Sequence, residues 1–406
     1  MDSRKHYQEL ASKWLNGTIS KEEMAEFSAW YNQQEDELVV PSHFVRNEAE
    51  HKQRIRRKIQ AAIQEQSMHH RAKRKQLVWK LAVAATVLIV CGVAAFWLSQ
   101  KSLFTKSEPY VLYEKEVTPG VTKATLTLAT GEQIALDGKN EDASATHGGL
   151  QITTLEDGVV TLQVADAAKQ EHLDVEKVSW NTIRTPAGGE IKIKLPDQSM
   201  VYLNAASSIT FPTRFSGTER RVILSGEAYF EVEKSQLANR HQPFIVEAEQ
   251  QEINVLGTTF NVQAYVNESN IITTLMSGAV KLTAKGDGEA SNGRILKPGQ
   301  QAMVNKMNGK IQIATVDLDE AMAWKEGYFV FNNEGIKSIM AKISRWYDID
   351  VSYQGKVDSV RFLGVYDREK NLQKLLKDIE LTGKVSCKII SDNHSEKGRR
   401  IMVMAK

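Results

Sequence analysis

The chain has 406 residues and carries 52 Lys and Arg against 50 Asp and Glu, which gives a formal net charge of +2. This length exceeds the roughly 250 to 300 residues at which a single core usually stops growing, so several domains are expected. Cys91 and Cys387 are the only cysteines, which excludes a fold held together by a disulfide framework.

Residues 1–76 are predicted to form a small all-α module of three or four helices. Apolar residues recur at helical spacing in a first stretch, and Ser20 with Glu23 forms a capping box that starts a second helix. The two apolar stripes consist of Tyr7, Leu10, Ala11, Trp14 and Leu15, and of Met24, Phe27, Trp30 and Tyr31. Trp14 and Trp30 can simply fill the core, but so small a module leaves apolar faces that can also fill a groove in a partner.

Residues 77–100 are predicted to form one transmembrane helix. The 20 residues from Leu81 to Gln100 carry no formal charge, and a helix of that length, with a rise of ~1.5 Å per residue, spans a hydrocarbon layer of about 30 Å. A buried core helix is the alternative, but this stretch is apolar on all sides rather than along one stripe. A cleaved signal peptide is disfavoured because the stretch begins only after residue 80.

Basic residues precede this segment. Residues 52–80 contain ten Lys and Arg and a single acid, Glu65, so the positive-inside rule predicts that the N-terminus lies in the cytoplasm and the C-terminus beyond the membrane. The same run could bind nucleic acid, but it lies beside the predicted membrane segment and lacks interleaved aromatic residues. No direct contact with nucleic acid is therefore predicted.

Residues 101–316 are predicted to form a mainly-β domain. Apolar and polar residues alternate with period two around a turn, as is typical of β-hairpins, in the segments 125–136, 151–164 and 191–203. Further strands are expected at 220–232, 244–247, 252–266, 271–282 and 301–304. Many short strands with little helix between them favour a sandwich, a jelly roll or a β-solenoid, and the sequence alone does not separate these.

The sequence contains none of the catalytic motifs sought. Motifs of zinc proteases, serine hydrolases and phosphate-binding loops are absent, and the nine His are scattered. One carboxylate cluster, Glu227, Glu231 and Glu233, lies on an expected strand. Glu227 and Glu231 would be about 13 Å apart, beyond the roughly 5 to 9.5 Å of glycosidase pairs. Glu231 and Glu233, about 7 Å apart, would fit that range. Alternation places them on the face opposite Ala228, Phe230 and Val232, so a solvated outer face is the better interpretation, and no enzyme, cofactor or metal site is predicted.

Residues 317–406 are predicted to form a small α+β domain. Strands are expected at 329–331, 350–353, 359–363, 385–390 and 400–404, and amphipathic helices at 336–347 and 372–379. We expect two helices on one face of a small sheet, whose edge strand is open to pairing with another chain. Cys387 is expected to be a buried, inert thiol.

Several long blocks from residue 185 onward resemble the FecR domain. They are, in order, TPAGGEIKIKLPDQSMVYLNAASSITFPTRF, RRVILSGEAYFEV, QPFIVEA, INVLGTTFNVQAY and TTLMSGAVKL. The block LKPGQQA and the pattern W-x-x-G-x-F-x-F at 324–331 resemble the end of that domain and the start of the next domain of many relatives. WLNGTIS at 14–20 resembles the N-terminal module of the family. The chain is thus similar to FecR-type anti-sigma factors, and its C-terminal domain looks like the short domain of secretins and TonB-dependent receptors.

This resemblance implies a single-pass protein of the inner membrane whose cytoplasmic module holds an extracytoplasmic-function sigma factor. The residues expected to contact the sigma factor are Trp14, Leu15, Phe27 and Trp30. The periplasmic domains would sense the signalling domain of a TonB-dependent outer-membrane receptor, and intramembrane proteases are further implied partners. The alternative is a membrane-anchored periplasmic glycan-binding or scaffold protein, in which residues 1–80 are only an anchor.

The resemblance also suggests two more specific sites. Some relatives cleave themselves at a Gly-Thr bond in this motif, which corresponds here to Gly257 and Thr258, where the Thr hydroxyl would attack the Gly carbonyl. The receptor is expected to pair with an edge strand of the C-terminal domain by β-augmentation, with Trp346 and Tyr347 contributing to the contact. Core packing is the simpler interpretation of both aromatic residues.

Overall fold

The structure, a computed structural model, describes the greater part of the chain. The described residues are Glu23, 115–137, 144–155, 158–165, 179–237, 240–284 and 293–406.

The fold class predicted from the sequence, with an all-α module and one transmembrane helix beside the β domain, is wrong for the described part of the chain. That part is mainly β, because period-two alternation dominates it, and its helices are α6 (Leu318–Met322), α7 (Ile336–Tyr347) and α8 (Leu372–Glu380). No helix within the described ranges combines the length and the apolar character that crossing a bilayer requires. Apart from Glu23, the residues of the predicted helical module and membrane segment, 1–76 and 77–100, lie outside the described residues.

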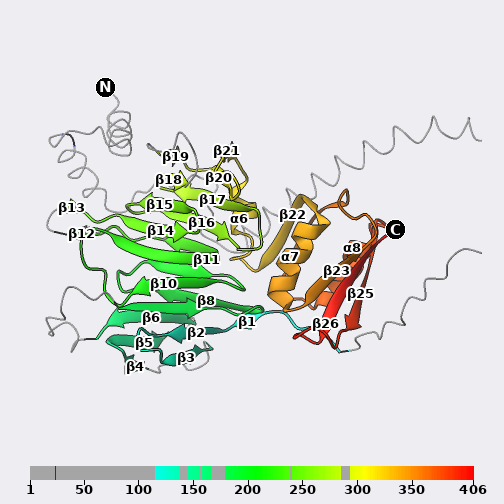
Figure 1. Ribbon diagram of the computed structural model, residues 1–406, viewed down its shortest axis with the longest axis horizontal. Coiled ribbons are helices and arrows are strands. Elements are labelled where there is room, and N and C mark those ends of the chain that lie inside the picture. Colours follow the sequence, from blue (N-terminus) through cyan, green and yellow to red (C-terminus); the bar gives the residue numbers. More distant parts are fainter. Residues whose placement is uncertain are drawn as a thin grey trace, which may run out of the picture.

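Two large sheets that share one strand form the β domain (Figure 1). In order of pairing, the first sheet contains β3 (Gln133–Leu136), β2 (Ala124–Thr127), β7 (Trp180–Arg184), β10 (Ser208–Pro212), β11 (Arg220–Glu231), β14 (Phe244–Ala248), β15 (Gln251–Val255), β18 (Val280–Ala284) and β19 (Arg294–Leu296). The second contains β4 (Ser144–His147), β5 (Leu150–Thr154), β6 (Val159–Val164), β8 (Gly189–Lys194), β9 (Met200–Leu203), β11, β16 (Thr259–Ala264), β17 (Asn270–Ser277), β20 (Gln300–Asn305) and β21 (Ile311–Thr315). The short β1 (Val121–Thr122) pairs in parallel with β8, and β12 (Gln236–Leu237) pairs with β13 (Arg240–His241).

Strand β11 passes from the first sheet to the second at Gly226. Its residues up to Ser225 pair with β10 and β14, and those from Gly226 onward pair with β9 and β16. Gly226 has a φ of +95°, and a Cβ at this position would lie 2.3 Å from Ser207 Oγ. Glycine is required here because a side chain would be strained in its backbone and would also clash.

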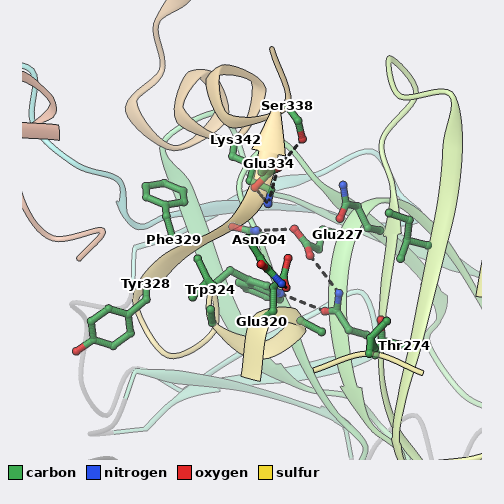
Figure 2. A pocket seen from close by; sticks show the side chains of 18 of the residues that line it. Asn204, Glu227, Thr274, Glu320, Trp324, Tyr328, Phe329, Glu334, Ser338 and Lys342 are labelled. Atoms are coloured by element: carbon green, nitrogen blue, oxygen red, sulfur yellow. Dashed lines mark hydrogen bonds and ion pairs between the residues drawn. The ribbon is translucent and has the colours of Figure 1, made fainter. Parts of the chain in front are cut away.

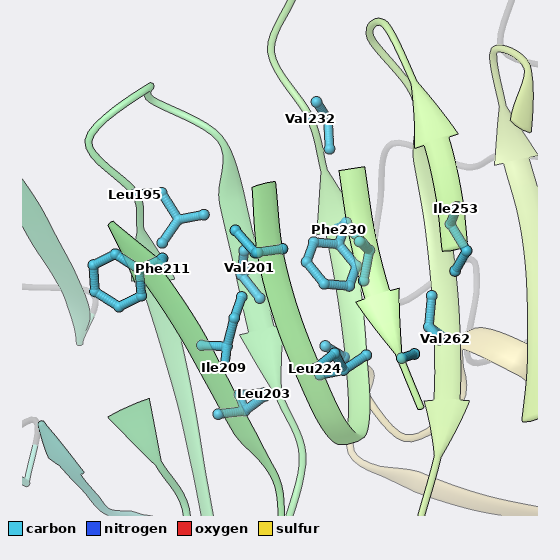
Figure 3. Packing of buried hydrophobic residues seen from close by; sticks show 14 of the residues in the cluster. Leu195, Val201, Leu203, Ile209, Phe211, Leu224, Phe230, Val232, Ile253 and Val262 are labelled. Carbon is cyan, nitrogen blue, oxygen red and sulfur yellow. The ribbon is translucent and has the colours of Figure 1, made fainter. Parts of the chain in front are cut away.

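The side chains between the two sheets form one hydrophobic core, to which Phe211, Phe230 and Ile253 belong (Figure 3). Phe230 of the second sheet stacks on Phe260 with 5.0 Å between ring centroids and lies 6.2 Å from Phe244 of the first sheet. Burial of each ring stabilises the fold by about 1.5–3 kcal/mol. The same alternation turns the intervening residues of the second sheet outward, toward the C-terminal module.

The C-terminal module contains two small sheets instead of the single sheet that we expected. β22 (Tyr328–Gly335) pairs with β24 (Arg361–Asp367), and β26 (Arg399–Ala405) lies between β23 (Asp350–Gln354) and β25 (Val385–Ser391). The sheets are separate because β23 pairs in parallel with β26 and not with β22. A second core joins these strands to the apolar faces of α7 and α8.

The segment 115–117 is bonded to this C-terminal module. Gln373 of α8 donates a hydrogen bond from its side chain to the Lys115 carbonyl at 3.1 Å and accepts one from the Val117 amide at 3.4 Å. The Leu372 amide donates to the Val117 carbonyl at 3.3 Å, and Val117 is fully buried in the second core. The segment 115–117 is therefore held against α8 of the C-terminal module.

Candidate functional site

A cavity of about 710 Å³ lies between the second sheet and the C-terminal module (Figure 2). Outward-facing side chains of β11, β16, β17 and β20 form its floor, and α6, β22 and α7 contribute its walls. Ligand pockets of small molecules commonly occupy about 300–1,000 Å³ and often lie between domains. The cavity is therefore the candidate site of the described part of the chain.

The strand register organises the floor into two parallel rows that cross the sheet. Cross-strand pairing places Asn261, Thr274 and Gln301 directly beside one another in one row. The next row contains Glu227, Gln263, Ile272 and Met303. One row is thus wholly polar and the other changes from polar to apolar along its length.

Glu227 lies at the centre of a buried hydrogen-bond network. Its Oε2 accepts from Asn204 Nδ2 at 2.8 Å and its Oε1 accepts from Asn261 Nδ2 at 3.1 Å. Burial raises the pKa of Glu227, and the two amide hydrogen bonds oppose that rise. Trp324 Nε1 donates to Asn261 Oδ1 at 3.1 Å, which fixes the amide so that its NH₂ group points to the carboxylate (Figure 2).

Arg368 connects this network to the C-terminal module. Its Nη2 donates to Asn204 Oδ1 at 2.9 Å and its Nη1 donates to the Trp324 carbonyl. The guanidinium lies 3.7 Å from the ring centroid of Trp346, which in turn donates from Nε1 to the Arg368 carbonyl at 2.8 Å. Burial lowers the pKa of Arg368, and the carboxylate of Glu190, 3.5 Å away, opposes that shift.

Other charged side chains of the cavity are paired within the protein. Lys342 Nζ lies 2.9 Å from Glu334, and Arg345 forms a 2.8 Å ion pair with Glu268. Asn332 donates to Glu320 at 3.1 Å, and burial raises the pKa of Glu320. Among the described residues, no group of three or more His, Cys, Asp and Glu side chains is arranged so that it could hold a metal ion.

The sequence-based interpretation of the carboxylate cluster is wrong for Glu227. Glu227 was expected on a solvated face, but it is 9% exposed because the C-terminal module covers that part of the sheet. Glu233 is exposed, and Glu231 is half-buried with its carboxylate 3.8 Å from Lys325 Nζ. The three side chains therefore do not form one site.

Gly257 and Thr258 lie in the bend before β16. Thr258 is 4% exposed, and its hydroxyl donates to the Ala279 carbonyl at 3.1 Å. A Cβ at Gly278 would lie 2.8 Å from this hydroxyl and 2.9 Å from the Gly257 carbonyl oxygen, so the bend is tightly packed. Self-cleavage stays a prediction.

Trp346 and Tyr347 are both buried in the second core, at 5% and 1% exposure. The Tyr347 hydroxyl donates to the Lys370 carbonyl at 2.6 Å. Both side chains thus pack the core, and a contact with a receptor through them stays a prediction. Trp14, Leu15, Phe27 and Trp30, expected to bind a sigma factor, lie outside the described residues.

Sequence reasoning missed Asn204, Asn261, Trp324 and Arg368 as members of one site. Asn261 gave no separate signal, because it alternates with Phe260 and Val262 just as Thr259 and Gln263 alternate with their apolar neighbours. Nothing in the sequence indicates that Arg368 reaches a residue 164 positions earlier.

Two family models match the chain. Residues 181–281 match the model described as FecR protein, and residues 328–396 match the model described as FecR, C-terminal. The chain therefore contains a FecR domain followed by a FecR C-terminal domain. The predicted family resemblance is therefore confirmed, and the cavity lies between residues of the FecR domain and of the FecR C-terminal domain.

Two solved structures are similar to this chain. Both are crystal structures, at 2.50 and 1.65 Å resolution, of a candidate anti-sigma factor from Parabacteroides distasonis ATCC 8503. Each is 27% identical in sequence with a TM-score of 0.48, and the match covers 56% and 55% of this chain and 99% of each of those chains. No curated protein gives a match.

Proposed function

We propose that this protein is a FecR-type anti-sigma factor, which binds a sigma factor and controls when that factor directs transcription. The observation that carries the proposal is the succession of a FecR domain and a FecR C-terminal domain at 181–281 and 328–396. The likeness of residues 14–20 to the N-terminal module of FecR-type anti-sigma factors supports it. In this account the chain is a regulator and not an enzyme.

The finer parts of the proposal concern partners and location. The sigma factor is of the extracytoplasmic-function class, and the signal comes from the signalling domain of a TonB-dependent outer-membrane receptor, with intramembrane proteases as further partners. The protein resides at the inner membrane with the FecR domains in the periplasm. The excess of Lys and Arg at 52–80 supports this orientation. A reporter enzyme that is active only outside the cytoplasm, fused after Lys406, should then be active.

The C-terminal module offers a docking edge for the receptor. β23 and β25 each pair on one side only within the described residues, so each presents an open edge on which a strand of the receptor can be added. Proline substitutions on the outer edges of both strands should abolish receptor binding. Unchanged receptor binding would remove the receptor from the proposal.

A short path leads from this module toward the N-terminal part of the chain. The segment 115–117 is bonded to Leu372 and Gln373 of α8, and α8 packs against β25. A receptor that moves β25 or α8 would therefore act directly on the segment that continues to the sigma-binding module. The relay need not pass through the whole β domain.

Transcript profiling of the native host tests the proposal. Loss of the chain should change transcription of one set of genes that shares a promoter sequence and depends on one extracytoplasmic-function sigma factor. Loss of residues 1–76 alone should change the same set. A host whose transcripts stay the same with and without the protein, under every condition in which it is made, would contradict the anti-sigma role.

A further inference from the structure

The floor of the cavity carries a row of uncharged polar side chains. Asn261, Thr274 and Gln301 form a continuous row of amide and hydroxyl groups, within which Gln301 Nε2 donates to Thr274 Oγ1 at 2.8 Å. An amide offers both donors and acceptors, as does a hydroxyl. The row is suited to a ligand whose own groups both donate and accept.

The charges that line the cavity are balanced and already hydrogen-bonded within the protein, which argues against an ionic ligand. Each acidic and basic lining residue has a bonding partner in the protein; these residues are Glu227, Asp317, Glu320, Glu334, Lys342, Arg345, Arg361 and Arg368. The set contains four acids and four bases, so it is also balanced. A charged ligand would meet no excess of opposite charge and would have to break one of these bonds, at a cost that a neutral ligand avoids.

Apolar surface lies beside the polar row. Ile272 and Met303 are directly opposite each other in the second row of the floor, and Trp324 and Phe329 stand on the wall (Figure 2). Trp324 is half-buried, so its indole ring also borders the cavity. The site thus combines hydrogen-bonding groups on one side with flat apolar surface on the other.

We infer that the cavity is a binding site for a short neutral saccharide. The hydroxyl groups of a saccharide both donate and accept, which suits the half-buried Gln301 and the hydrogen-bonding capacity that Asn261 and Thr274 retain, and the C–H face of a sugar ring packs against Trp324 or Ile272. The volume of about 710 Å³ fits a ligand of this size. The inference goes beyond the anti-sigma role and does not depend on it.

Binding at this site would also act on the arrangement of the two domains. The floor belongs to the β domain, while Asn332, Glu334 and Lys342 of the walls belong to the C-terminal module. A ligand held by both parts favours the arrangement in which both contact it, by mass action. Saccharide binding is therefore expected to raise the unfolding temperature of the protein.

Isothermal titration calorimetry with the purified full chain tests the inference. The probes are neutral disaccharides with different stereochemistry: cellobiose, maltose, lactose and N,N′-diacetylchitobiose. At least one should bind with a stoichiometry of one and raise the unfolding temperature. A Gln301→Leu variant should weaken that binding by about tenfold, because one hydrogen bond to the sugar is lost.

Two further variants keep the test decisive. Ile272→Trp places an indole ring in the cavity and should abolish binding by filling it, while Gln133→Leu, at an exposed position of β3 in the first sheet, should bind as the wild type does. Unfolding temperatures of the unliganded variants establish that they are folded. The inference is overturned if none of the four disaccharides binds at about 10 mM, where even a Kd near 1 mM would be detected, or if Ile272→Trp binds as the wild type does.

Discussion

At the scale of single residues, the network around Glu227 shows how neighbouring side chains fix each other's orientation. Asn261 Oδ1 accepts from Trp324 and Asn204 Oδ1 accepts from Arg368, so both amides must present their NH₂ groups to Glu227. Only a group with two acceptor oxygens satisfies both donors. A carboxylate does so, and an amide does not.

Glu227→Gln should therefore destabilise the protein although it removes a buried charge. The Gln NH₂ group would face an Asn NH₂ group, which leaves buried donors unpaired at a cost of about 1–3 kcal/mol. Denaturant unfolding would measure the change in the free energy of unfolding. Glu233→Gln, at an exposed position, is the control and should stay within about 0.5 kcal/mol of the wild type. Equal stability of the Glu227→Gln variant would contradict the orientation of the two amides.

Cys387 allows a second prediction at this scale. Burial raises the pKa of its thiol to about 12, with the nearby Glu380 carboxylate adding to the rise. At pH 8 the reactive thiolate is then scarce, so iodoacetamide should alkylate Cys387 in the folded protein at least about 100-fold more slowly than in guanidinium chloride. A Cys91→Ala background makes Cys387 the only thiol. Similar rates in both states would show that the thiol is accessible and ionised.

At the scale of secondary-structure elements, the sequence predicts strands and helices well where one periodicity holds. The stripe from Ile336 to Tyr347 predicts the bounds of α7, and the alternation at 191–203 predicts the hairpin of β8 and β9. Local periodicity does not predict which distant strands pair. Nothing local in Asp350–Gln354 distinguishes a parallel partner, β26, from β22, and the single sheet expected for the C-terminal module is accordingly wrong.

The crossing of β11 between sheets depends on Gly226. Gly226→Ala should destabilise the protein by more than the ~1 kcal/mol that a positive φ costs, because the new Cβ also clashes with Ser207. Gly217→Ala is a matched control: its φ is +97°, and a Cβ there meets nothing within 4 Å. Thermal unfolding of both variants separates the clash from the backbone strain. Equal losses in the two variants would mean that Ser207 moves away freely.

At the scale of the whole molecule, the contacts of Arg368 join the two domains. This side chain is 2% exposed and bonds to Asn204 and to the Trp324 carbonyl while it stacks on Trp346. The Gly188 amide also donates to the Arg345 carbonyl at 2.7 Å across the same boundary. Because these contacts link residues far apart in the chain, sequence periodicity could predict each domain's strands but not the cavity between the domains.

Arg368→Met should loosen the C-terminal module from the β domain without unfolding either core. The variant keeps much of the volume of the side chain but loses its hydrogen bonds to Asn204 and Trp324, so the cooperative unfolding of the wild type should separate into two transitions. Hydrogen exchange should increase at the domain boundary and stay unchanged within the core around Phe230. Lys337→Met, at an exposed ion pair, is the control. A single unshifted transition in Arg368→Met would show that other contacts hold the domains together.

The anti-sigma role is tested most directly by capture of partners from the native host. The tagged full chain should retain an extracytoplasmic-function sigma factor, identified by mass spectrometry. A variant with Trp14→Ala and Trp30→Ala should lose that sigma factor while its FecR domains stay folded. If the wild type captures no sigma factor under any growth condition, the anti-sigma role is contradicted. If the double variant captures as much sigma factor as the wild type, the assignment of binding to the N-terminal module is contradicted.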